Sequence, residues 1–204
     1  MRYYVEFTDK EKKILASLVQ RRIETIQDLS GSYSVSYSIR LNFEDTIIDF
    51  TPDEISTPEK DKPLADVTRP LITDDQSQLR PDLSWSTIAE NVGTIKKIAI
   101  LQTLVTFSQF LSPTDTNIHT IVYGTGEAWK SLLHHPGNLL IEGSENLSDQ
   151  SIVNLDIGVA IFTDKGLVIT IFTDAHSYFV YGEIADKLPD TLKSQIALKF
   201  IDES

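Results

Sequence analysis

The chain has 204 residues, of which 41% are hydrophobic and 24% are charged, and it contains no cysteine. This composition is ordinary for a globular protein, and the absence of cysteine excludes disulfide bonds, thiolate catalysis and cysteine-ligated zinc. The formal net charge of −12 makes a nucleic acid an unlikely partner, because binding its phosphates draws on lysine and arginine.

No apolar run in the sequence approaches the ~20 residues of a membrane-spanning helix. The N-terminal sequence MRYYVEFTDKEKK also lacks the apolar core of a signal peptide. We therefore expect a cytoplasmic protein with no membrane partner, organised as a single domain over residues 1–204. Prolines and acidic residues gather between residues 51 and 82, which predicts one long loop in that domain.

The first fifty residues are predicted to form a strand, a helix and a hairpin. Residues 2–7 alternate in the manner of a short strand. The capping-box pattern Thr8-Asp9-Lys10-Glu11, followed by apolar residues at intervals of three and four, predicts an amphipathic helix over residues 9–29. Residues 33–43 alternate apolar and polar side chains, which predicts a half-exposed strand whose row of serines is a candidate contact surface. Residues 46–50 are expected to pair with it.

Helices are predicted for much of the middle of the chain. Residues 84–92 fit a short helix, and residues 95–111 fit a longer one that ends at Ser112-Pro113. The remaining elements expected in this part are a strand at 67–72, a strand at 117–123, a helix at 127–134 and a strand at 139–142.

The clearest β pattern lies between Ile152 and Ile184, and it predicts three successive antiparallel strands. Apolar residues occupy alternate positions in 153–163, and Asp164-Lys165-Gly166 supplies a turn. Residues 167–173 are apolar on both faces, as expected of a central strand that is covered on both sides. The last element, over residues 189–201, is predicted to be a helix.

Together these elements predict an α+β fold, with a mostly antiparallel β-sheet and three or four helices packed largely on one face. The sheet is expected from residues 33–50 and 153–184, with strands near 3–7 and 117–123 added. The helices expected to cover it span residues 9–29, 95–111 and 190–201.

A glycine-rich turn is a candidate ligand-binding site. Gly124 and Gly126 follow a predicted strand and open a predicted helix, which is the context in which a backbone approaches a pyrophosphate. Trp129 stands where a dinucleotide-binding fingerprint requires glycine or alanine, and no alternating series of strands and helices surrounds the turn. A plain glycine turn is therefore the alternative interpretation, and the sequence identifies no cofactor.

Three histidines and an aspartate form a candidate metal or general-base site. His134 and His135 end a predicted helix, where an imidazolium would complement the helix dipole. His176 lies in a predicted loop, two residues after Asp174. If the two segments meet, these side chains could bind a metal or abstract a proton. The alternative is a purely structural role, because the sequence contains no HExxH or H-x-E spacing.

Asn154 and Asp156 are expected on the polar face of a predicted strand. Functional groups require such rigid placement. The simpler interpretation is that they lie on a solvated sheet face.

Two classes of function are compatible with these patterns. The first is a non-enzymatic acidic interaction module, such as an inhibitor, an immunity-type protein or an assembly subunit, that binds a protein partner. The alternative is a small-ligand sensor, or a metal- or nucleotide-dependent enzyme, with a pocket near Gly124–Trp129 and His176. The sequence leaves the partner, any catalytic activity and the oligomeric state open.

Overall fold

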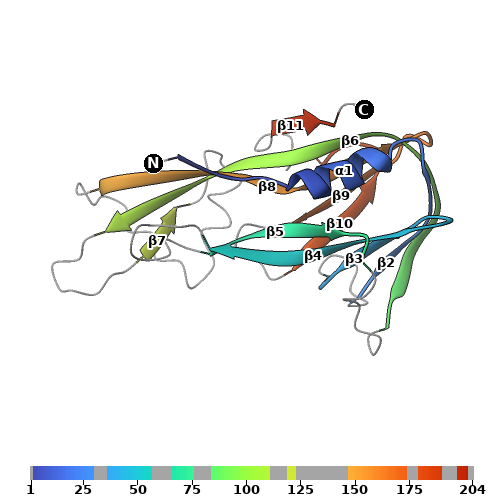
Figure 1. The fold of residues 1–204 in the computed structure, drawn as a ribbon, viewed down its shortest axis with the longest axis horizontal. Coiled ribbons are helices and arrows are strands. Elements are labelled where there is room, and N and C mark those ends of the chain that lie inside the picture. Colours follow the sequence, from blue (N-terminus) through green and yellow to red (C-terminus); the bar gives the residue numbers. More distant parts are fainter. Residues whose placement is uncertain are drawn as a thin grey trace.

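The computed structural model describes residues 2–29, 36–56, 66–75, 84–110, 119–122, 147–173, 179–189 and 197–201. Within these residues, eleven strands form one sheet, accompanied by a single α-helix (Figure 1). The helix is α1 (Asp9–Ser17). The strands are β1 (Arg2–Val5), β2 (Arg22–Asp28), β3 (Ile39–Asn42), β4 (Ile47–Ser56), β5 (Asp66–Thr73), β6 (Ser86–Phe110), β7 (His119–Val122), β8 (Leu147–Thr163), β9 (Val168–Thr173), β10 (Val180–Ala185) and β11 (Ala197–Phe200).

The main path of the sheet has the order β10-β9-β8-β6-β2-β3-β4-β5, and every neighbouring pair on it is antiparallel. Off this path, β1 pairs with β8 in parallel, and β7 and β11 pair with β6. The sheet curls back on itself, because Val180 of β10 bridges to Ser36, shortly before β3. Their backbones exchange two hydrogen bonds of 3.0 and 2.7 Å.

Strand β6 is 25 residues long and joins the two halves of the sheet. Its residues 86–94 pair with β2, whereas the part that follows pairs with β8. At the junction the backbone has a positive φ at Asn91 (52°) and Gly93 (118°), which bends the strand. The turn after β8 holds this bend, because the Asp164 carboxylate accepts a hydrogen bond from Thr94 N at 2.8 Å.

A single hydrophobic core fills the interior of the curled sheet, with residues from β2, β3 and β4 on one side and from β6, β8 and β9 on the other. Full burial of one such side chain stabilises the fold by about 1.5–3 kcal/mol. The largest completely buried side chains include Phe50, Leu15, Ile23, Ile98 and Ile100.

Helix α1 begins at the predicted capping box, which is confirmed. The Thr8 side chain accepts a hydrogen bond from Glu11 N at 3.3 Å, and the Glu11 carboxylate accepts one from Thr8 N at 2.8 Å. Ile14 and Leu15 are buried in the core. The helix ends after Ser17, and the chain turns directly into β2.

The helix predicted over residues 9–29 is therefore wrong beyond Ser17. Ile23 and Ile26 are three residues apart, as on one face of a helix, but both enter the core from strand β2. The register between β2 and β6 shifts between Ile23 and Thr25, where β6 contains one residue more than β2, as in a β-bulge. The alternation of buried positions in β2 is interrupted at the same place, and this leaves the three-residue spacing that suggested a helix.

The helices predicted at 84–92 and 95–111 are also wrong, because residues 86–110 form the strand β6. Residues 98–101 are all buried, so both faces of the strand are covered there and the sequence shows no alternation. The predicted helix 190–201 contains strand β11 instead. Among the described residues, the predicted α+β fold with three or four helices is thus replaced by a mostly antiparallel sheet with one short helix.

The three strands predicted between Ile152 and Ile184 are confirmed as β8, β9 and β10. Gly166 has the expected positive φ, 77°, in the turn between the first two. The strands predicted within residues 67–72 and 117–123 correspond to β5 and β7. The elements predicted at 127–134 and 139–142 lie outside the described residues.

The predicted serine-faced contact surface is not confirmed in the described part of residues 33–43. Ser36 and Ser38 are buried, whereas Tyr37 is 57% exposed. The Ser36 hydroxyl donates a hydrogen bond to the Asp28 carboxylate at 3.2 Å. These serines therefore belong to the closure of the sheet rather than to its surface.

Candidate functional site

The predicted ligand and metal sites stay predictions, because their residues lie outside the described part of the chain. This applies to Gly124, Gly126, Trp129, His134, His135, Asp174 and His176. Within the described residues, no group of three or more histidine, aspartate or glutamate side chains is arranged to hold a metal ion.

Asp156 is not on a solvated face, so that interpretation is wrong. Its side chain is buried and accepts hydrogen bonds from Phe7 N at 2.7 Å and from Gln102 Nε2 at 2.6 Å. Burial raises the pKa of the Asp156 carboxyl, and the hydrogen bonds from Gln102 and Phe7 partly offset that rise. Asp156 thus ties the chain just before α1 to strand β8.

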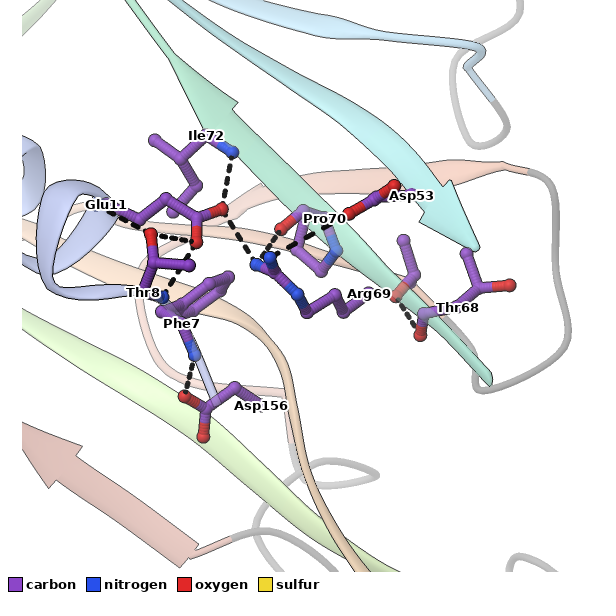
Figure 2. Close-up of polar contacts among 10 residues, drawn as sticks. Phe7, Thr8, Glu11, Asp53, Thr68, Arg69, Pro70, Ile72 and Asp156 are labelled. Atoms are coloured by element: carbon purple, nitrogen blue, oxygen red, sulfur yellow. Dashed lines mark hydrogen bonds and ion pairs between the residues drawn. The ribbon is translucent and has the colours of Figure 1, made fainter. Parts of the chain in front are cut away.

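A buried ion pair connects α1 with β5 (Figure 2). Arg69 Nη1 donates to Glu11 Oε1 at 2.7 Å, and the two side chains are only 6% and 3% exposed. The Glu11 carboxylate also accepts hydrogen bonds from the N–H and hydroxyl of Thr8 and from Ile72 N. Burial alone would raise the pKa of Glu11, but the hydrogen bonds from Arg69, Thr8 and Ile72 outweigh it and lower the pKa. Glu11 is therefore held as a structural carboxylate.

Side chains bond to several backbone groups along the free edge of β5. This strand pairs with β4, and Pro70 lies directly opposite Pro52 in the register. Proline has no N–H, so the two form a non-hydrogen-bonded pair, and Thr68, Pro70 and Ile72 direct their backbone groups away from β4. Three of these outward groups have a side-chain partner: the Thr173 hydroxyl donates to the Thr68 carbonyl (3.1 Å), Arg69 donates to the Pro70 carbonyl (3.3 Å), and Ile72 N donates to Glu11 (3.1 Å).

Strand β11 presents an edge of the opposite kind. Its pairing with β6 continues at Ile201, whose N–H donates to the Ile98 carbonyl at 3.0 Å. Hydrogen-bonded and non-hydrogen-bonded pairs alternate along an antiparallel ladder. Lys199 therefore also bonds to β6, whereas Leu198 and Phe200 turn their N–H and C=O groups away. No described residue pairs with these outward groups, which we call the β11 edge.

The side chains at the β11 edge are apolar and exposed. Leu198 is 36% exposed and Phe200 is 46% exposed. The Lys97 ammonium lies 4.8 Å from the ring centroids of both Phe200 and Phe162, and those two centroids are 6.2 Å apart. Each such exposed cation–π contact is worth about 0.5–1 kcal/mol, so the Phe200 ring is held in place at the surface.

A groove of about 410 Å³ adjoins the end of β11, and we call it the α1 groove. Its lining comes from one face of the helix and from the residue after β11: Asp9, Lys12, Lys13, Ala16, Ser17 and Ile201. Figure 1 shows α1 and β11 on the same side of the molecule, close to β6. Lys12 donates to Glu6 at 2.9 Å, a contact that raises the pKa of Lys12 and lowers that of Glu6. Lys13 is exposed and forms no ion pair with a described residue.

The β11 edge was missed because the whole of residues 189–201 was predicted as a helix. The signal that could have identified it is short, the alternation of Leu198 and Phe200 around Lys199. An exposed lysine within a very short strand is typical of a sheet edge. No sequence pattern could have shown that α1 lies beside it.

Comparison with protein-family models, with curated proteins and with solved structures finds no match to this chain. The described residues include no helix with the length and apolar character that crossing a membrane requires. The geometry of the described residues is therefore the basis for a functional proposal.

Proposed function

We propose that this chain is a non-enzymatic protein-interaction module that binds a partner protein along the β11 edge. The observation that carries the proposal is the contrast between two edges of the same sheet. Side chains bond to three outward backbone groups in the middle of β5, at Thr68, Pro70 and Ile72, whereas those of Leu198 and Phe200 have no described partner. An exposed strand edge is a ready-made template for pairing with another chain.

The burial of the charged groups supports a binding role over a catalytic one. Glu11 is bonded to Arg69, and Asp49 is bonded to Arg40 through contacts of 2.7 and 2.9 Å. The Arg40 guanidinium also lies 3.8 Å from the centroid of the Trp85 ring. These buried pairs join neighbouring elements, so their chemistry is used within the fold.

Photo-crosslinking in the native host tests the proposal. A photoreactive phenylalanine analogue replaces Phe200 in the full chain, and the matched control carries the same analogue at Tyr37, which is similarly exposed. We expect one protein to be crosslinked in stoichiometric amount from position 200 and not from position 37. Equal or absent crosslinking at the two positions would contradict the proposal.

A further inference from the structure

We infer that the β11 edge takes up an extended segment of the partner whose side chains alternate between apolar and acidic. This inference rests on the proposed function and specifies the chemistry of the partner. It follows from the backbone geometry of β11, from the two different faces of that strand, and from the local charge around it.

The backbone geometry selects an extended segment. Leu198 and Phe200 are two residues apart, so their outward N–H and C=O groups repeat with the period of a β-strand, about 6.6–6.8 Å. A partner segment in the same conformation satisfies both sets of groups by main-chain hydrogen bonds. A helix cannot, because its own N–H and C=O groups are already bonded internally.

The two faces of β11 differ in chemistry. Leu198 and Phe200 point to one face, where Phe200 lies beside Phe162 and Lys97. Lys199 and Ile201 alternate with them and point to the other face, and Ile201 lines the α1 groove. A strand added next to β11 has its side chains on the same two faces, since side chains alternate with a period of two. One set of partner side chains therefore meets apolar groups, and the other set meets the groove.

The charge on the groove side favours carboxylates. Lys13 and Lys199 are both exposed there, and neither forms an ion pair with a described residue. Lys12 is already paired with Glu6. Asp9 also lines the groove, and Glu6 lies close enough to Lys199 to interact with it, so the three lysines outnumber the two carboxylates by one. Even this small excess of cations contrasts with the net charge of −12 of the chain. Acidic side chains on the added strand would complement it, whereas a second copy of this acidic chain would be repelled as a whole.

Peptide binding to the full-length chain tests the inference. The probes are a peptide that alternates valine and glutamate, one that alternates valine and lysine, and a valine–glutamate peptide N-methylated on alternate residues. Binding is followed by fluorescence anisotropy and by the amide NMR signals of Leu198 and Phe200. We expect the valine–glutamate peptide to bind at least tenfold more tightly than either other probe, with shifts at both amides.

Charge reversal within α1 provides a matched pair of variants. Lys13→Glu should weaken binding of the valine–glutamate peptide several-fold, whereas Lys10→Glu should leave it unchanged. Both lysines are exposed on the same helix, but only Lys13 lines the groove. Equal effects of the two substitutions would overturn the role of the groove.

The possible outcomes separate this inference from the proposed function. If the crosslinked partner is found but the lysine peptide binds as well as the glutamate peptide, the acidic inference is overturned and the interaction module stands. If no peptide binds and Phe200 crosslinks nothing, both are overturned. A dimer in sedimentation that disappears in Leu198→Pro would show that a second copy occupies the edge, and it would overturn the inference.

Discussion

Replacing Arg69 with methionine tests whether the buried pair with Glu11 holds α1 against β5. Methionine keeps the length of the side chain and removes its charge. Glu11 would remain 3% exposed, with hydrogen bonds from Thr8 and Ile72 but without a cation. Removing one partner of a buried pair costs about 3–5 kcal/mol, because the other charge stays buried. A typical domain has a free energy of unfolding of about 5–15 kcal/mol, so the loss would be large.

The assay is urea unfolding at neutral pH, followed by circular dichroism. The double variant Glu11→Gln with Arg69→Met removes the stranded charge and should recover about 1–3 kcal/mol relative to the single variant. A loss below about 1 kcal/mol for Arg69→Met would refute the reasoning. It would mean that water solvates the Glu11 carboxylate, or that another group balances its charge, once Arg69 is removed.

The pH dependence of this pair gives the same reasoning an independent check. In the folded protein the pKa of Glu11 is lowered, so its contribution to stability is fully present above the unfolded pKa, about 4.3. That contribution is lost as pH falls through the folded value. In Arg69→Met the sign should reverse, since burial then dominates and protonation relieves the stranded charge. Urea midpoints measured from neutral pH to below the unfolded pKa of Glu11 distinguish the two slopes.

Three further variants test other parts of the fold. Gly158→Ala should lower the free energy of unfolding in urea by about 3 kcal/mol, because the new Cβ would lie 2.2 Å from the Ile171 carbonyl oxygen. Gly166→Ala should lower it by only about 1 kcal/mol, because the residue has a φ of 77° but open space around it, and similar losses in the two variants would contradict this. Lys199→Pro should expose the amides of β11 to hydrogen exchange, whereas Leu198→Pro should not, because the register directs the Lys199 N–H toward β6 and the Leu198 N–H away from it. Equal exchange in the two variants would show a different register. Burial raises the pKa of Asp156, so the contribution of this carboxyl to stability should fall as pH rises from the unfolded pKa, about 3.9, through the raised folded value. Asp156→Asn should abolish that slope, and an unchanged slope would refute its assignment to Asp156.

The local patterns that proved reliable depend on few residues close in sequence. The capping box spans Thr8 to Glu11 and needs no other part of the chain to form. The strict alternation in 153–163 and the glycine turn at Gly166 likewise specify strands β8 and β9 by local chemistry. These features predicted an antiparallel sheet from the sequence alone, but not that strands take the place of most of the predicted helices.

The helical errors have one physical origin. Hydrophobic spacing reports helix or strand only where a strand is regular and one of its faces is solvated. Opposite a bulge in β6, Ile23 and Ile26 of β2 are both buried with a spacing of three. In β6 both faces are covered over residues 98–101, so the apolar run carries no period. Bulges and double-sided burial are set by which strands pair, and pairing is a tertiary property.

The candidate site, the β11 edge, depended on the tertiary structure even more than the helices and strands did. The residues of the predicted ligand and metal sites, Gly124, Gly126, Trp129, His134, His135, Asp174 and His176, lie outside the described residues, and those sites stay predictions. The composition and charge determined what kinds of partner to expect, and the local patterns determined several strands. Only the fold decided which strand edges remain open, because two of the groups that bond to the edge of β5, Glu11 and Thr173, lie 61 and 105 positions away in the chain from the residues they bond. Backbone hydrogen bonding is local in chemistry but not in sequence, so the open edge at Leu198 and Phe200 becomes visible only when every other strand has its neighbours.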